Sequence, residues 1–270
     1  MVKEIQLHSK SPNYLESRGA EQSQLLISEG ERCLVIETIS GPSDESCTNI
    51  LVPRNSSLEH IRIVTSPESS TLKSRVKVEL LEGSSYSSKS FYLCPQKEME
   101  DLNEITLKGE GAEASVLALS LVRPLQNIKH EVLVDHKVPH CKSQQLVKSI
   151  VSSRGRSQYI GRVLVQGGAI KSDSHQLSRH MLLGRLAEAD PRPQLEIFND
   201  DVKAAHGATV GQVNREELFY LQSRGLSPRQ ALELLSQGFA DEIVLTVSEA
   251  ARAQVSRLVQ EAFQFMVVEL

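Results

Sequence analysis

The sequence lacks several features that would place it in a common functional class. It has no tryptophan, aromatic residues make up only 4% of it, and it contains neither a GxxxxGK[ST] phosphate loop nor a GxGxxG fingerprint. The net charge of −4 is spread along the chain, which argues against a basic surface for nucleic acid. We therefore expect neither nucleotide binding by these motifs nor a nucleic-acid partner.

Long apolar runs are also missing. Uninterrupted runs such as residues 116–119 and 265–268 have four residues, whereas a membrane helix needs about 20. The first residues, MVKEIQLHSKSPNYLESRG, include no apolar segment of signal-peptide length. These absences predict a cytoplasmic protein that associates with no membrane.

Cysteine is scarce, and its spacing is informative. The four cysteines, Cys33, Cys47, Cys94 and Cys141, include no CxxC pair. In a cytoplasmic chain this predicts reduced thiols and no zinc-finger site.

Up to about residue 211, short alternating segments predict β-strands. In RVKVELLEG, Val76, Val78 and Leu80 fall on one face and charged residues on the other. Similar segments recur every 11 to 21 residues as far as Leu195, joined by loops too short for helical crossovers. A β-sandwich and a parallel β-solenoid both fit. The lack of a strict repeat counts against the solenoid, and the scarcity of NG and DG turns counts against hairpins, so the residues alone leave both open.

From residue 211 onward the apolar spacing becomes helical. Asn214, with Glu217 three positions later, predicts a capping box at the start of a first helix that Gly225 ends. A third helix is predicted from about Ser248 to Phe265.

Between them, Ser227 followed by Pro228 predicts a second helix that ends at Gly238. Its expected apolar face consists of Ala231, Leu234 and Leu235. The chain is thus divided into a loosely ordered segment, residues 1–30, a β domain, residues 31–212, and a helical domain, residues 213–270.

Three groups of residues are candidates for chemistry. In NDDVKAAHGATVGQVN, alternation places His206 on the face of Val202 and Ala204, just before Gly207 is expected to break the strand. This histidine could bind a metal or simply hydrogen-bond a loop carbonyl. The other two groups could also be a metal site or ordinary solvated edges; they are His130, His136, His140 and Cys141, and Asp173, His175 and His180.

Residues 193–243, PQLEIFNDDVKAAHGATVGQVNREELFYLQSRGLSPRQALELLSQGFADEI, resemble the SufB/SufD family of iron–sulfur cluster assembly proteins, and most closely its SufD branch. The long pieces LEIFNDDVKAAHGATVG, LFYLQSRG and ALELLSQGFADEI carry the likeness. Weaker similarity extends back to residue 136. The resemblance implies a mainly β chain, a right-handed parallel β-helix followed by a small C-terminal helical domain.

The resemblance also implies partners and a site. The last β-helix strands would pair with a SufB-type subunit or with a second copy of the chain, and His206 of the HGAT motif would act there with a SufB cysteine. The C-terminal helices would bind a SufC-type ABC ATPase. The residues we assign to that contact are Phe219, Tyr220, Arg224, Leu234, Leu235 and Phe239.

In the segment where SufB carries its cysteine, HQLSRHMLLG, this chain has Ser178 and Arg179 instead. We therefore expect a non-catalytic subunit with no cofactor of its own, which shares transient iron or an Fe–S cluster with its partner. The alternative is a β-helix carbohydrate-active enzyme whose paired carboxylates would come from Asp173, Asp200 and Asp201. The lack of tryptophan and of a secretory signal counts against that enzyme.

Overall fold

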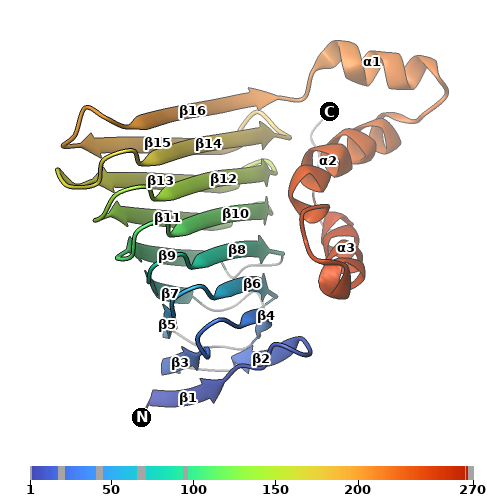
Figure 1. The fold of residues 1–270 in the computed structure, drawn as a ribbon. Helices are drawn as coiled ribbons and strands as arrows, with labels where there is room; N and C mark the ends of the chain where they lie inside the picture. The colour runs from blue at the N-terminus through green and yellow to red at the C-terminus, as the bar shows by residue number, and fades with distance from the viewer. Residues whose placement is uncertain are drawn as a thin grey trace.

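The computed structural model describes residues 2–17, 22–40, 45–65, 71–93, 97–264 and 266. Within these residues the chain forms sixteen β-strands followed by three α-helices (Figure 1). Cys94 and Phe265 lie outside the described residues.

The strands form two parallel sheets that face each other. The odd sheet contains β1 (Val2–Gln6), β3 (Gln22–Leu26), β5 (Glu45–Val52), β7 (Thr71–Leu80), β9 (Glu98–Leu107), β11 (Asn127–His136), β13 (Arg156–Val165) and β15 (Glu188–Ile197). The even sheet contains β2 (Asn13–Ser17), β4 (Arg32–Ile39), β6 (Ser57–Val64), β8 (Ser85–Tyr92), β10 (Glu113–Val122), β12 (Lys142–Val151), β14 (Asp173–Leu182) and β16 (Lys203–Gln212).

Each strand pairs in parallel with the strand two positions earlier, so the chain winds as a solenoid. In the even sheet, for example, Glu113 pairs with Lys142, Lys142 with Asp173, and Asp173 with Lys203. A β-sandwich built from hairpins would show antiparallel neighbours instead. The prediction of a mainly β, parallel β-helix with a C-terminal helical part is confirmed, and the sandwich is excluded.

The corners of the solenoid repeat a backbone conformation rather than a sequence. Left-handed residues stand two positions before successive strands of the even sheet: Gly30, Asn55, Gly83, Gly111, His140 and Lys171. Glycine adopts this conformation without strain, but asparagine, histidine and lysine also occupy it here. Because the residue type varies, the repeat is hidden in the sequence.

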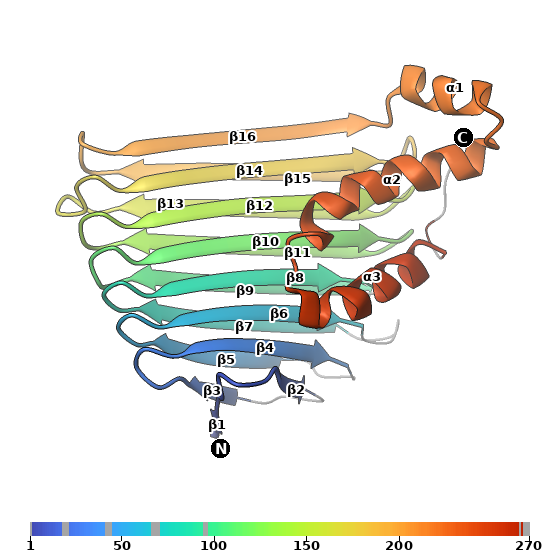
Figure 2. The same cartoon turned by 45° about the vertical axis from the view of Figure 1, so that its right-hand side comes forward.

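The two sheets differ in what covers their outer faces. The odd sheet is open to solvent outside, and β7 alternates strictly between exposed and buried residues, with Val76, Val78 and Leu80 inside as predicted. The even sheet is covered outside by α2 (Pro228–Val244) and α3 (Glu249–Phe263), which lie across its strands (Figure 2). In β6, Ile61 and Ile63 therefore belong to the cluster beneath the helices.

The solenoid begins before residue 31, the boundary that the sequence predicted. The strands β1, β2 and β3 lie within residues 1–30, where we expected loose order, and β3 pairs with β5. Their side chains are largely polar, so the hydrophobic pattern did not reveal them. Backbone pairing to a neighbouring strand does not require an apolar face.

The helices begin near the predicted residues, but the capping box predicted between Asn214 and Glu217 is not formed, and the second helix ends elsewhere. Asn214 caps α1 (Arg215–Ser223) by accepting from the backbone N–H of Glu216, and Gly225, with φ of 93°, follows its end. Ser227 forms a capping box with Gln230 at the start of α2. Gly238 does not end this helix, because burial of later residues outweighs the cost of about 1 kcal/mol for a helical glycine.

The predicted apolar face of α2 is also shifted. Ala231 is buried as expected, but Leu232 is buried in place of Leu234, which is 51% exposed.

Ion pairs fix α2 on the even sheet, and a hydrogen bond fixes the loop that follows it. Lys148 of β12 and Arg179 of β14 both contact the carboxylate of Glu242 on α2, and the Lys148 ammonium lies 3.9 Å from the centre of the Phe239 ring. Burial lowers the pKa of Lys148, although Glu242 opposes that shift. Further along, Lys89 of β8 donates to the carbonyl of Thr246 at 2.7 Å. The helices are therefore fixed to specific strands.

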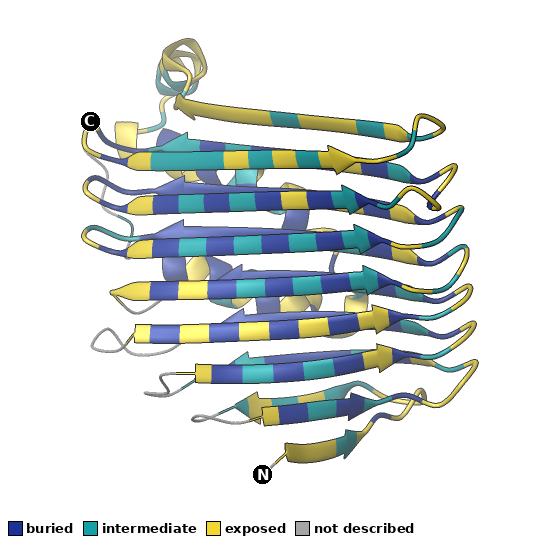
Figure 3. Cartoon of the chain, turned by 90° about the vertical axis from the view of Figure 1, so that its left-hand side faces the viewer, coloured by how far each residue is buried: buried dark blue, intermediate teal, exposed yellow. Residues whose placement is uncertain are grey.

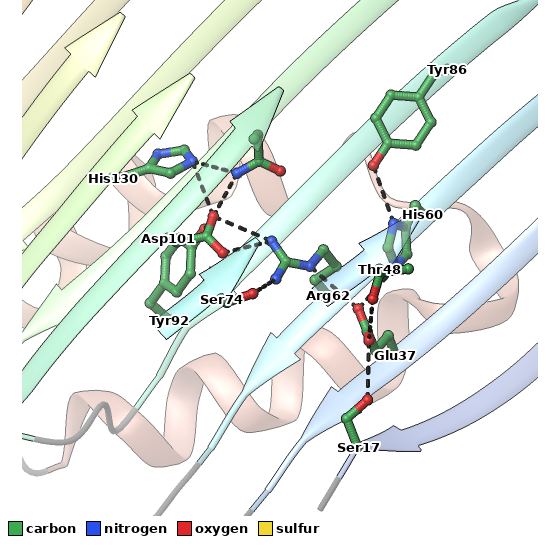
Figure 4. Close-up of polar contacts among 11 residues, drawn as sticks. Ser17, Glu37, Thr48, His60, Arg62, Ser74, Tyr86, Tyr92, Asp101 and His130 are labelled. Carbon is green, nitrogen blue, oxygen red and sulfur yellow. Dashed lines mark hydrogen bonds and ion pairs between the residues drawn. The ribbon is translucent and has the colours of Figure 1, made fainter. Parts of the chain in front are cut away.

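Inside the solenoid, a network of charged side chains joins the two sheets (Figure 4). Arg62 of β6 donates through Nε to Glu37 Oε2 at 3.3 Å, and its Nη1 lies 3.0 Å from Asp101 Oδ1 of β9. His60 Nε2 lies 3.1 Å from Glu37 Oε2, and His130 Nε2 lies 3.5 Å from Asp101 Oδ2. All five side chains are buried, so each charge is stabilised by its partner rather than by water.

Burial and the neighbouring charges both shift the pKa values of the network's members, and they act in opposite directions. Burial alone would raise the pKa of Glu37, but the hydrogen bond to His60 and the charges of His60 and Arg62 outweigh it and bring that pKa to about 2. Against the same burial effect, Arg62 lowers the pKa of Asp101. Burial lowers the pKa of His130 to about 4, although Asp101 opposes this. The folded state thus keeps the acids charged and this histidine neutral.

We expect acid to destabilise the fold through these groups. A histidine with a depressed pKa in the folded state binds its proton more readily when unfolded, so the contribution of His130 to stability is lost as the pH falls from about 6.5 towards 4. Between about pH 7 and pH 4.5, the wild type should lose roughly 2 kcal/mol more unfolding free energy than His130→Gln. Urea unfolding at both pH values measures this; equal losses in the two proteins would contradict the assignment.

Candidate functional site

The solenoid ends in a turn that has no further strand to cover it. β16 pairs with β14 on one side only, and β15 is likewise the last strand of the odd sheet. The strands from β3 to β14 all contain buried residues, whereas β15 and β16 are exposed or half-buried along their whole length (Figure 3). The interior of the solenoid is therefore accessible at this end.

His206 faces the interior at this open end. Its register partner on β14 is Gln176, an interior residue that is 3% exposed. The next residue, Gly207, lies on the opposite face, since a Cβ there would approach Leu177 of the helix-covered side to 3.2 Å. His206 is exposed only because no strand follows β16. Gly207 does not break the strand as predicted, because β16 continues to Gln212.

Apolar side chains surround the open end. Ile197 is 39% exposed, Phe198 65% and Val210 43%. On β15, Pro191 and Pro193 pair in register with interior positions of β13 and are only half-buried. A long edge strand with one free side, beside exposed apolar residues, is typical of a surface that another chain can cover.

The predicted histidine–cysteine cluster is not brought together as a metal site. His130 belongs to the charged network, and His136 Nε2 lies 2.8 Å from Ser143 Oγ. His140 occupies a corner with φ of 60°, and the buried thiol of Cys141 donates to the carbonyl of Gly109 at 3.4 Å. Within the residues that the structure describes, no group of three or more His, Cys, Asp or Glu side chains could hold a metal ion.

The third candidate group is also separated. Asp173 and His175 form an exposed pair at 2.9 Å, whereas His180 faces inward, with Nδ1 2.5 Å from Ser149 Oγ. Burial lowers the pKa of His180 to about 4. The carboxylates proposed for a carbohydrate-active enzyme, Asp200 and Asp201, are exposed in the turn before β16. Asp173 is already paired, so the geometry gives that alternative no support.

No thiol lies on the last turn in the described part of the chain. Cys33 is in β4 and Cys47 in β5, near the other end of the solenoid, and Cys141 stands at the corner before β12. Ser178 of β14 is buried, and Arg179 contacts Glu242. A thiolate beside His206 would therefore have to come from outside these residues.

The residues assigned to a helical contact fall into two groups. Phe219 is 72% exposed, Tyr220 56% and Leu234 51%, and a groove of about 550 Å³ between α1 and α2 is lined by Asn214, Glu216, Glu217, Tyr220, Leu221, Leu234 and Leu235. The guanidinium of Arg224 stacks 5.1 Å from the Tyr220 ring centre. Phe239, in contrast, packs on Lys148 and is half-buried at the sheet. Phe219, Tyr220 and Leu234 therefore form an exposed surface on α1 and the first half of α2.

Sequence reasoning missed the polar interior beneath the last turn. Gln176, Ser178 and His180 all face inward on β14 and are almost fully buried. In the sequence they look like the polar half of an ordinary alternating strand. No local signal shows that this polar half faces the core.

Comparison with known proteins identifies the family. Residues 10–239 match the model described as "SUF system FeS cluster assembly, SufBD core domain". The chain is 32% identical to Escherichia coli SufD over 222 residues, which is 80% of this chain and 52% of that protein. It is 36% identical over 152 residues to a SufBD family protein of Mycobacterium leprae, covering 53% of this chain and 39% of the relative.

The chain is also 33% identical over 147 residues to SufD of Plasmodium falciparum, covering 54% of this chain and 10% of that protein. The chain thus spans about half the length of the Escherichia coli relative and less of the others. Among the described residues, no helix is long and apolar enough to cross a membrane. The family model spans most of the solenoid together with α1 and part of α2, and the chain therefore belongs to the SufB/SufD family of iron–sulfur cluster assembly proteins.

Proposed function

We propose that this chain is a SufD-like, non-catalytic subunit that helps to assemble Fe–S clusters. It pairs through its last turn with a SufB-type subunit or a second copy of itself, and it binds a SufC-type ABC ATPase through α1 and α2. The iron or cluster is cargo at the shared interface. The observation that carries this proposal is the exposed, interior-facing His206 on an edge strand that pairs only with β14.

The free edge of β16 favours pairing with another strand. Its ten residues, KAAHGATVGQ, include no proline, and its backbone groups on one side have no neighbouring strand. β15 contains Pro191 and Pro193, and proline cannot donate a backbone hydrogen bond. A partner strand would therefore add to β16, while the apolar side chains of β15 would contact the partner by packing.

At such an interface His206 would supply a nitrogen ligand. Imidazole can replace cysteine as an iron ligand in Fe–S centres, and a thiolate is the stronger nucleophile and ligand. Because the described cysteines lie away from the last turn, the thiolate would come from the partner. The paired chains would thus hold a site that neither holds alone.

The α1–α2 surface is the second contact. Tyr220 and Leu234 line the groove, Phe219 is exposed on α1, and α1 has no buried residue. The sheet therefore does not require these side chains for packing. A surface of this kind suits a partner that buries an apolar helical face, and the resemblance supports an ABC ATPase as that partner.

Replacing Phe219 and Leu234 together by serine should abolish capture of the purified SufC-type ATPase. Both side chains are exposed, so the free energy of unfolding should stay within about 1 kcal/mol of the wild-type value. The matched control is Leu245→Ser, which removes a leucine that is 63% exposed at the far end of α2. Calorimetric titration of the ATPase measures the effect. Equal affinity of the double variant and the control would remove this surface from the proposal.

For His206, we expect His206→Ala to leave folding and partner pairing intact while cluster formation in cells drops severalfold. The side chain is exposed, so no buried hydrogen bond is lost and the melting temperature should not change. Complementation in a strain that lacks the subunit, together with a thermal melt, measures both quantities. Full complementation by a stable variant would show that His206 is not a ligand.

A further inference from the structure

A group of buried polar atoms near the open end has no hydrogen-bond partner among the described residues. The atoms are Nε2 of Gln145, Nε2 and Oε1 of Gln176, Oγ of Ser178 and Nε2 of His180. All four side chains belong to β12 or β14, face the interior and are at most 3% exposed. Buried polar atoms in proteins are almost always hydrogen-bonded, so this group points to a binding partner inside the solenoid.

Further from the open end, the polar interior is satisfied by its own side chains. Arg62 contacts Glu37 and Asp101, and its Nη2 also donates to Ser74 Oγ at 2.5 Å. His60 lies within hydrogen-bond distance of Glu37. The same solenoid thus pairs its polar groups directly in one part of the interior, whereas in β12 and β14 several remain without such a partner.

Side chains of the neighbouring strands cannot supply the missing bonds. Above Gln176, Ser178 and His180, β16 places His206, Ala208 and Val210, and a single imidazole has only two nitrogens. Backbone groups of β12 and β14 are used in the sheet, because each of these strands pairs on both sides. Across the core, the interior positions of β15 carry side chains without a polar atom: Ala189, Pro191, Pro193, Leu195 and Ile197.

Short side chains leave room for small molecules at this level. Arg62 crosses the core to reach Asp101 of the odd sheet at 3.0 Å. In the last turn, the register column of Arg62 is occupied by Ser178 and that of Asp101 by Pro191. A width of the core that an arginine spans is therefore left to a serine and a proline. Buried water occupies sites of this kind, where space and several polar partners coincide.

We propose that the interior of the last two turns is a hydrated compartment, in which ordered water molecules bridge the unpaired atoms of Gln145, Gln176, Ser178 and His180 and reach the open end beside His206. Leaving all of these atoms unpaired would cost as much as the whole stability of a typical domain, whereas one buried water makes several hydrogen bonds. A chain bound over β16 would close the compartment. That consequence rests on the proposed function; the hydration does not.

The test is a crystal structure of the full chain at a resolution that shows ordered water, with oxygen-17 relaxation dispersion to count long-lived internal water in solution. Solvent density is expected within hydrogen-bond distance of Gln176 and Ser178. Ser178→Val should lose at least one of these waters, because valine fills the space and has no hydroxyl. The matched control is Val134→Ala, which opens space in an apolar column between Ile105 and Val163 and should gain no water, since apolar cavities stay dry.

An interior without solvent density, in which the four side chains pair with one another, would overturn the proposal. The same water count in wild type and Ser178→Val, or a water gained by Val134→Ala, would also overturn it. Failure of a SufB-type partner to bind the chain would instead count against the proposed function and leave the water count unchanged.

Discussion

A parallel solenoid must end somewhere, and its last turn leaves a row of backbone groups and an interior face without a covering strand. In this molecule the two ends meet that constraint differently. β1 has five residues and is mostly polar and exposed. β16 has ten residues and no proline. It includes the exposed Val210, and the exposed Phe198 lies in the turn that precedes it. The second end is therefore the one suited to a partner, and it is the end that presents His206.

The helices connect this end to the body of the solenoid. Only Val213 and Asn214 separate β16 from α1, and α1 projects beyond β16 in Figure 1. Glu242 of α2 forms ion pairs with Lys148 of β12 and Arg179 of β14, and β14 is the neighbour of β16 in the sheet. The α1–α2 groove is thus connected to the last turn in two ways. The chain runs directly from β16 into α1, and Glu242 of α2 is ion-paired with Lys148 and Arg179 of the even sheet.

Sequence patterns predicted most of the strands after residue 30 and the approximate helix starts, but they predicted neither the solenoid nor the residues around His206, whose role stays a prediction. Alternation identifies strands in sandwiches and solenoids alike, and the pairing of Glu113 with Lys142 is a long-range relation that no local pattern shows. In β6 the alternation is even misleading: Arg62 faces the interior while Ile61 faces the helices, because both sides of the even sheet are covered. Gln176 was missed for the same reason. The choice of a β-helix came from the resemblance, which the family match then confirmed.

The central claim is that the last turn of the solenoid, and not the first, is the surface that a SufB-type partner covers. Hydrogen–deuterium exchange of the full chain, with and without that partner, tests it directly, because β1 at the opposite end serves as an internal control. The account predicts that the free-edge amides of β16 become protected on binding, while those of β1 exchange as before. Unchanged exchange at β16, or protection at β1 instead, would contradict it.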